Sequence, residues 1–162
     1  MRILVNTDNG MNILGQGPKI LLFTIPAVAG AVAAHILAPD WIRIPLPGSV
    51  LGPIGVALIT AGAILWLTAV AQLVVGFPKG KLVRTGAYGV CRNPIYSSFG
   101  FFVLPGLSLL CGTWIYLAPA AVLCLGVVIL IRREERDLLR VFGDKYRSYT
   151  ARVHRIIPFG TP

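Results

Sequence analysis

The sequence predicts an all-α integral membrane protein with about four transmembrane helices, the last two in a tight hairpin, followed by a cytoplasmic amphipathic helix. Hydrophobic residues make up 56% of the 162 residues, whereas soluble domains contain about 45–50% apolar residues. They form runs longer than about 18 residues, which is typical of membrane-spanning helices. The formal net charge is +9, but the basic residues flank the apolar runs, so no nucleic-acid partner is expected. The length fits a single membrane-embedded domain.

Residues 1–18 form a polar tail that lacks the charged start, short apolar core and cleavage site of a signal peptide. The first span is expected at residues 19–37. It contains Pro26, which is tolerated in lipid, and His35, which is expected to form a hydrogen bond at the interface or between helices.

The second span is expected at residues 50–77, which is longer than the roughly 20 residues that a span needs, so it should tilt or protrude. Its small residues predict close packing against another helix; they are Gly52, Gly55, Ala61 and Gly62. Gln72 has two interpretations that stay open here: it packs against another helix, or it contacts a ligand below the span.

Residues 95–131 are apolar throughout. A single helix of this length would measure roughly 55 Å, against a membrane core of about 30 Å. Two short spans, at residues 95–110 and 114–131, therefore fit better, with the chain reversing at Cys111-Gly112-Thr113.

The stretch from Lys81 to Tyr96 is the long polar interruption between the apolar blocks. Its Asn93-Pro94 step predicts the start of a helix, because proline suits the first helical position and asparagine can cap the free N–H groups. We expect a loop that leads into a helix at the membrane surface, with the positive end of the helix available to a ligand.

The composition changes sharply at Arg132. Five apolar residues then recur at spacings of four, four, three and four, which predicts one face of a helix; they are Leu138, Phe142, Tyr146, Tyr149 and Val153. This amphipathic helix should lie on the membrane or against the spans, with Gly143 as a candidate break. Residues 156–159 are expected to be an apolar tail packed on the body.

Charge predicts the orientation. With four spans, fourteen of the fifteen basic residues lie on one side, and only Arg43 lies on the other. Basic residues collect on the cytoplasmic side, so both termini and the central loop are expected there, in a multi-pass protein of a prokaryotic inner membrane.

The three cysteines are expected to be unpaired and structural, because they lack metal-type spacing. No metal site, Ser–His–Asp set or phosphate loop is indicated. Glu134 and Glu135 stand where the last span emerges, and acidic residues there are costly unless paired or functional. The ordinary interpretation is that they pair with nearby arginines. We favour it for Glu135, whereas the resemblance described next favours a functional role for Glu134.

Four motifs in order resemble the isoprenylcysteine carboxyl methyltransferase and phospholipid methyltransferase family, over residues 72–159. They are Gly86-Ala87-Tyr88 with Arg92-Asn93-Pro94-Ile95-Tyr96, then Glu134-Glu135, then Phe142-Gly143-Asp144-Lys145-Tyr146-Arg147-Ser148-Tyr149, and finally Arg155-Ile156-Ile157-Pro158.

The resemblance implies S-adenosylmethionine as cofactor and a lipophilic or lipid-modified acceptor that enters from the bilayer. The cofactor-binding residues that it implies are Gln72, Lys81, Leu82, Val83, Tyr88, Arg92, Asn93, Pro94, Ile95, Tyr96, Glu134 and Glu135. Glu134 and Arg133 are the residues it implies for the reaction.

Two positions depart from the family. The eukaryotic enzymes have histidine at Asn93, and the arginine that holds a prenylcysteine carboxylate falls at Leu130, with Arg132 or Arg133 as replacements out of register. Carboxylate, amine and thiol acceptors therefore stay open. An amine would have to lose a proton, which Glu134 or Glu135 could accept.

The expected activity is methyl transfer of the carboxyl-methyltransferase type, with a phospholipid amine or a thiol methyltransferase as alternatives. An NADPH-dependent membrane reductase, a small transporter and a non-enzymatic membrane protein are further alternatives.

Overall fold

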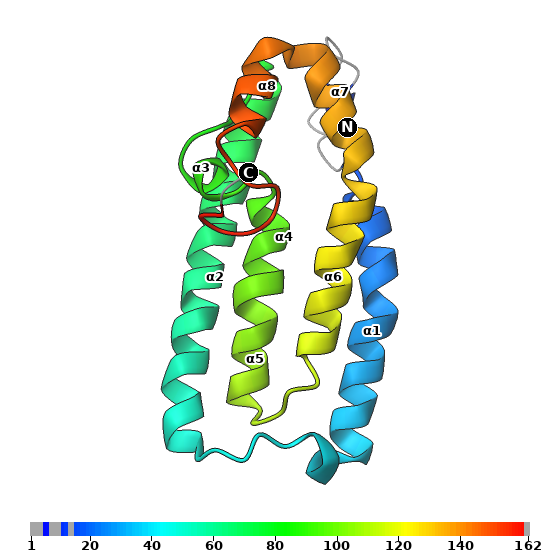
Figure 1. Cartoon of the computed structure of the whole chain (residues 1–162), viewed down its shortest axis with the longest axis vertical. Coiled ribbons are helices and arrows are strands. Elements are labelled where there is room, and N and C mark those ends of the chain that lie inside the picture. The colour runs from blue at the N-terminus through cyan, green and yellow to red at the C-terminus, as the bar shows by residue number, and fades with distance from the viewer. Residues whose placement is uncertain (1–4, 7–10, 13–14, 161–162) are drawn as a thin grey trace.

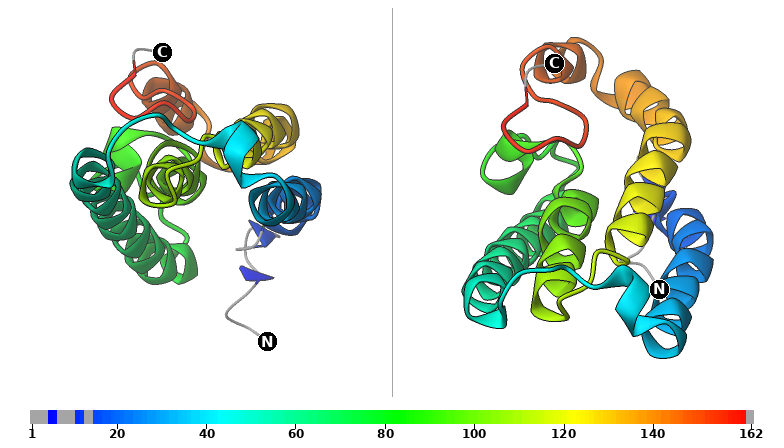
Figure 2. Two further views of the ribbon diagram at one scale, coloured as in Figure 1. Left: turned by 90° about the horizontal axis from the view of Figure 1, so that it is seen from below. Right: turned by 60° about the horizontal axis from the view of Figure 1, so that its bottom comes forward.

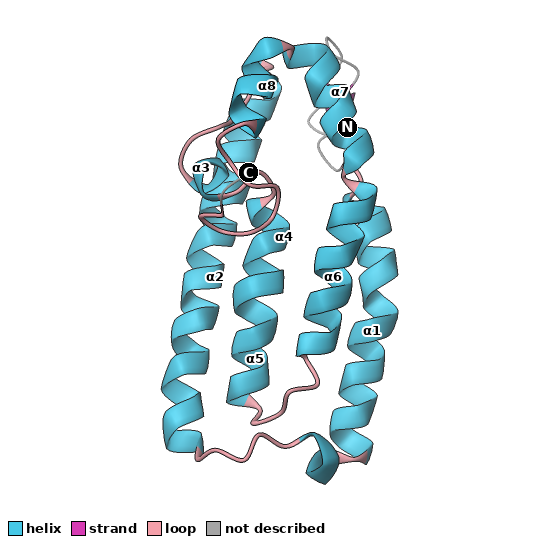
Figure 3. Ribbon diagram, in the orientation of Figure 1, coloured by secondary structure: helices cyan, strands magenta, loops and turns pink. Residues whose placement is uncertain are grey.

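The computed structural model describes residues 5–6, 11–12 and 15–160. Two short strands, β1 (Val5–Asn6) and β2 (Met11–Asn12), pair antiparallel. The rest of the described secondary structure is helical (Figure 3). The helices are α1 Gly17–Leu37, η1 Pro39–Ile42, α2 Gly48–Gly76, η2 Phe77–Lys79, α3 Ala87–Val90, α4 Pro94–Ser98, the π-helix η3 Phe99–Val103, α5 Leu104–Leu110, α6 Leu117–Leu130, α7 Arg132–Phe142 and α8 Asp144–Thr150.

Two pairs of long helices make the bundle (Figure 1). α2 packs along the continuous helix formed by α4, η3 and α5, whereas α1 packs along α6. Viewed from below, α1 lies beside α6 and α2 lies beside α5 (Figure 2). α7 continues upward from α6, and α8 folds back over the end of the bundle.

The helical segments Gly17–Leu37 and Gly48–Lys79 are long and apolar enough to cross a membrane, and only 17% of the most apolar window of each is buried. Two shorter apolar helices follow, Pro94–Leu110 and Leu117–Leu130. The expected apolar helices are therefore present near their predicted bounds. Because their outer faces expose large hydrophobic side chains, the fold is compatible with a membrane helical bundle.

Close packing of α2 depends on two of the predicted small residues. A Cβ on Gly55 would lie 2.8 Å from the carbonyl oxygen of Gly106 on α5, and a Cβ on Gly62 would lie 2.8 Å from Phe102. The prediction is wrong for the other two: nothing lies within 4 Å of a Cβ on Gly52, and Ala61 is exposed.

The reversal between the last two apolar helices occurs at the predicted place. Gly112 has φ +62°, a conformation that favours glycine. The connection between α1 and α2 is bonded to this turn, because Ile44 N–H donates to Gly112 O at 2.7 Å and Trp114 N–H donates to Ile42 O at 3.1 Å.

The C-terminal region is two helices and not one. Gly143 has φ 51° and ψ −126°, and it separates α7 from α8. Tyr146 and Tyr149 on α8 are buried, so this part of the apolar stripe faces the protein. The tail packs back through Ile156, which joins the core of Ile20, Leu123, Val127 and Ile131. The prediction fails for Phe159, which is 84% exposed.

Candidate functional site

A cavity of about 550 Å³ lies at the end of the bundle where α6 passes into α7. Its walls come from the loop before α4, from α7 and α8, and from the residues just before α1. Ligand pockets measure about 300–1,000 Å³, so the cavity has the size of a small-molecule site.

The structure brings most of the predicted site residues into this wall, although they come from distant parts of the chain. The predicted residues that line it are Lys81, Leu82, Val83, Tyr88, Arg92, Asn93, Pro94, Ile95, Tyr96, Glu134 and Glu135. Gln72 and Arg133 are not among the lining residues.

Gln72 supports the cavity from behind. Its Oε1 accepts a hydrogen bond from Ala87 N–H at 3.1 Å. Gly86 has φ +62°, and a Cβ there would collide with the Gln72 amide. Gln72 therefore holds the turn that places Tyr88, which agrees with the packing interpretation.

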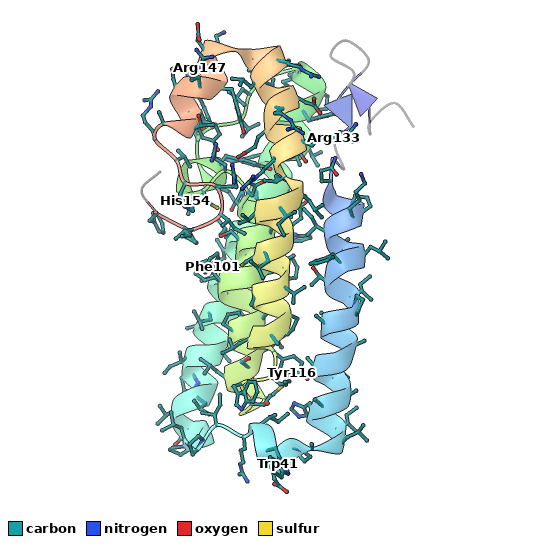
Figure 4. The ribbon with its side chains drawn as sticks, turned by 45° about the vertical axis from the view of Figure 1, so that its right-hand side comes forward. Trp41, Phe101, Tyr116, Arg133, Arg147 and His154 are labelled. Atoms are coloured by element: carbon teal, nitrogen blue, oxygen red, sulfur yellow. The ribbon has the colours of Figure 1, made fainter. Side chains whose placement is uncertain are left out.

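The two arginines considered for an acceptor carboxylate point elsewhere. Arg133 is exposed on α7 (Figure 4) and Arg132 lines a different cleft. The cations in the cavity wall are Lys81, Arg92 and Arg140.

Asn93 does not cap α4, which corrects the expectation from sequence. Its side-chain amide donates instead to Arg155 O at 2.9 Å. Two further bonds attach the same tail, from Arg92 N–H to His154 O at 2.9 Å and from Ser97 Oγ to Ile156 O at 2.8 Å. The chain's own C-terminal tail thus uses the Asn93 donor and anchors the cavity wall. Pro94 does occupy the first turn, as predicted.

Glu135 is held by two guanidinium groups. Its carboxylate lies 3.2 Å from Arg92 Nη1 and 2.6 Å from Arg155 Nη2, and the Glu135 and Arg92 side chains are each 13% exposed. This ion pair joins α7 to the loop before α4 and to the tail.

Glu134 has a different environment. Its Oε2 accepts a hydrogen bond from Gln16 N–H at 3.2 Å, and no basic side chain within the described residues forms an ion pair with it. Burial raises the pKa of this carboxyl, and the Gln16 bond opposes that shift. Burial likewise raises the pKa of Tyr88, and the Glu134 charge adds to it.

Gly15 and Gln16 line the cavity, whereas the sequence analysis placed them in the polar N-terminal tail and named neither as a site residue. Gly15 has φ +45°, and a Cβ there would collide with the Glu134 carboxylate. The signal was weak, because a Gly-Gln-Gly sequence before an apolar run has no specific interpretation. The aromatic residues of α8 were predicted as a stripe but not as site residues; Tyr146 and Tyr149 line the cavity, and Tyr149 donates to Tyr88 O at 2.6 Å.

Within the described residues, no group of three or more His, Cys, Asp or Glu side chains could hold a metal ion. The three cysteines are free thiols.

The chain matches no family model. It is 39% identical over 74 residues to methanethiol S-methyltransferase 1 of Bradyrhizobium diazoefficiens, a match that covers 44% of this chain and 24% of that protein. It is 32% identical over 79 residues to methanethiol S-methyltransferase of Crocosphaera subtropica, covering 49% of this chain and 30% of that protein. The similarity thus spans less than a third of either relative's length, and it supports a resemblance to methyltransferases.

Proposed function

We propose that this protein transfers a methyl group from S-adenosylmethionine to a lipophilic acceptor at the membrane–cytoplasm interface. One observation carries the proposal: the cavity contains the half-buried carboxylate of Glu134 without a cationic partner among the described residues, next to two tyrosine rings. The similarity to two proteins named as methyltransferases supports it independently.

A buried carboxylate without a countercharge favours a cationic ligand, because the ligand's charge offsets the loss of hydration. The rings of Tyr88 and Tyr96 line the same wall, and aromatic faces attract cations. S-adenosylmethionine carries a sulfonium and an ammonium group, and when bound it supplies an activated methyl group. Glu134, Tyr88 and Tyr96 would hold its cationic part, and Lys81 at the exposed rim would hold its carboxylate.

The residues of this chain contribute position and exclusion of water. α8 covers the cavity, with Tyr149 bonded to Tyr88 O and Arg92 held by Glu135. Groups fixed in this way can orient two reactants without covalent chemistry of their own. For an acceptor that must lose a proton, Glu134 is the candidate base, because burial raises its pKa.

A thiol is the acceptor that we favour over a prenylcysteine carboxylate. Both relatives are named for methanethiol. In addition, Arg133 is exposed away from the cavity wall, Arg132 lines another cleft, and Arg92 is committed to Glu135. A thiol has no carboxylate for these cations to hold. Its S–H proton is lost when the S–CH3 bond forms, and Glu134 is the candidate base that accepts it. A phospholipid amine is the remaining alternative, with Glu134 as base.

We also propose that the apolar helices cross the inner membrane as four spans with both termini cytoplasmic. Fourteen of the fifteen basic residues fall on the side of the cavity in this arrangement, as expected for the cytoplasmic side.

The test is calorimetric titration of the detergent-purified protein with S-adenosylmethionine and S-adenosylhomocysteine, with NADPH as the control ligand. We expect binding of the first two alone. Glu134→Gln should weaken S-adenosylmethionine binding by at least about tenfold, because it removes the countercharge.

Asp137→Asn is the matched control. It also removes one carboxylate from the cavity wall, but Asp137 is half-exposed and pairs with Arg140 at 3.5 Å. The affinity of the Asp137→Asn variant for S-adenosylmethionine should stay unchanged. Binding of NADPH, or equal losses in both variants, would contradict the proposal.

A further inference from the structure

A second cleft, of about 400 Å³, lies beside the first cavity. α7, α8, the loop before α4 and the C-terminal tail each contribute to it. Its basic lining residues are all arginines, namely Arg92, Arg132, Arg136, Arg147 and Arg155, and its acidic lining residue is Glu135.

The charge of this cleft is not balanced by its own carboxylate. Glu135 is already bonded to Arg92 and Arg155. Arg147 has an ion pair with Asp144 at 3.4 Å, but both side chains are largely exposed, so the attraction is weak. Arg132 and Arg136 are exposed, and no carboxylate within the described residues forms an ion pair with either.

One buried donor in this cluster lacks an acceptor. Arg92 Nε is buried without a hydrogen-bond partner among the described residues, although the guanidinium is fixed by Glu135 at 3.2 Å. A buried N–H without an acceptor is unfavourable. An anion that carries several oxygens would supply acceptors for such donors.

The position of the cleft selects the kind of anion. Arg132 is the first residue of α7 and lies two positions after the end of the apolar helix α6, so in the proposed membrane arrangement the cleft lies at the level of the lipid headgroups. Guanidinium groups bind phosphate oxygens in pairs, and basic pockets beside membrane helices on the cytoplasmic side are typical sites for anionic lipid headgroups. Leu139 adds an apolar contact to the same wall.

We propose that this cleft binds the phosphate of an anionic phospholipid headgroup from the cytoplasmic leaflet. Arg132 and Arg136 contact the phosphate from α7, and Arg147 contacts it from α8. Binding of this lipid does not depend on methyl transfer.

The two sites share a wall, because Arg92, Glu135 and Tyr146 line both of them. A headgroup bound to the arginines would strengthen the contact between α7 and α8 and so stabilise the cover of the first cavity. This consequence, a higher affinity for S-adenosylmethionine in anionic lipid, rests on the proposed function.

The test titrates the full-length protein in neutral detergent with phosphatidylglycerol and, separately, with phosphatidylcholine, and native mass spectrometry counts the lipids retained. We expect preferential retention of phosphatidylglycerol. In Arg136→Gln/Arg147→Gln the affinity for phosphatidylglycerol should fall by roughly fivefold for each arginine removed.

The matched control is Lys145→Gln/Arg152→Gln, which removes the same charge from exposed residues that line neither site. It should keep the wild-type affinity. Equal losses in both double variants would show diffuse surface attraction and overturn the proposal, as would an absence of preference for phosphatidylglycerol. Displacement of the lipid by inorganic phosphate at similar concentrations would overturn the headgroup assignment in favour of free phosphate. Each variant's melting temperature reports whether it is folded.

Failure of lipid binding and failure of the proposed function are separable. The lipid titration contains no cofactor, whereas calorimetry with S-adenosylmethionine can be done in lipid-free detergent.

Discussion

Glu134 and Glu135 are adjacent in the first turn of α7, but their environments are opposite. Glu135 bonds two guanidinium groups, at 3.2 and 2.6 Å. Glu134 accepts a backbone N–H from Gln16 and faces the cavity. A paired carboxylate stabilises the fold, whereas a buried one without a partner favours binding of a cation at some expense of stability. The two residues therefore predict different mutant behaviour.

The pH dependence of stability should report Glu134. Burial raises its folded-state pKa above that of the unfolded chain, so the folded protein holds this proton more tightly. The resulting stability is fully present below the unfolded pKa of about 4.3 and is lost as pH rises through the folded pKa. We expect the melting temperature to fall across this window less in Glu134→Gln than in the wild type. Affinity for S-adenosylmethionine should rise across the same window in the wild type.

Asp137→Asn is the comparison for this measurement. The charge of Asp137 adds to the raised pKa of Glu134, but it contributes less than burial does, so this variant should keep most of the wild-type decline in melting temperature. A Glu134→Gln protein whose melting profile matches the wild type at every pH would refute the assignment.

Gly15 offers a test of the wall before α1. Gly15→Ala should weaken ligand binding and lower the unfolding free energy by about 1–3 kcal/mol, because it strains a residue with φ +45° and moves the Glu134 carboxylate. Gly30→Ala is the control, since nothing lies within 4 Å of a Cβ there and alanine favours a helix over glycine by about 1 kcal/mol. Calorimetry and thermal unfolding check both variants. Unchanged affinity in Gly15→Ala would exclude a role for this segment.

At the scale of elements, the bend between α7 and α8 controls the site. α7 continues upward from α6, and α8 folds back beside it (Figure 1). α7 contributes Glu134 and Glu135 to the cavity wall, and α8 contributes Tyr146 and Tyr149. The bend is possible because Gly143 adopts φ 51°, which side chains disfavour. The bend at Gly143 thus places the apolar side of α8 against the cavity.

Gly143→Ala and Gly112→Ala form a matched pair. Both glycines have positive φ and nothing within 4 Å of a Cβ, but they lie at opposite ends of the bundle. Each substitution should lower the unfolding free energy by about 1–3 kcal/mol through backbone strain. Only Gly143→Ala should also weaken S-adenosylhomocysteine binding in calorimetry. Equal effects on binding would mean that the bend has no local role.

The helices could be predicted from local sequence, whereas the side-chain bonds that connect them could not. The apolar helices follow from continuous apolar sequence, and Gly112 and Pro94 mark their ends. Asn93 stands at the predicted N-cap position, but its side chain makes no capping bond. Its Nδ2 donates to the tail at Arg155 O, 62 residues away. Local sequence places the residue, but it does not show the distant acceptor that its amide reaches.

At the scale of the molecule, basic residues and the cavity gather at one end, whereas Trp41 and the Gly112 turn lie at the other (Figure 4). This arrangement predicts that the two ends of the bundle lie on opposite sides of the membrane. Cys111 is the exposed cysteine at the turn end, and Cys91 is buried. A membrane-impermeant maleimide should label Cys111 from the side opposite to that which labels an Arg147→Cys variant.

Cys111→Ser is the control for this experiment, because it should remove the labelling at position 111. Labelling of both positions from one side would contradict the four-span arrangement.

The helical class, the apolar segments and the reversal near Gly112 follow from the sequence alone, and the candidate residues from Lys81 to Tyr96 and at Glu134 were proposed from it. The helices and the reversal follow from it because membrane helices and helix ends depend on local composition and backbone preference. The tertiary structure was needed to show that Arg92 and Arg155 are the partners of Glu135, that Gln72 supports the wall from outside, and that Gly15 and Gln16 complete it. Those features depend on contacts between residues up to 118 positions apart in the sequence. In surroundings of low polarity, such contacts determine which charged side chain has a partner.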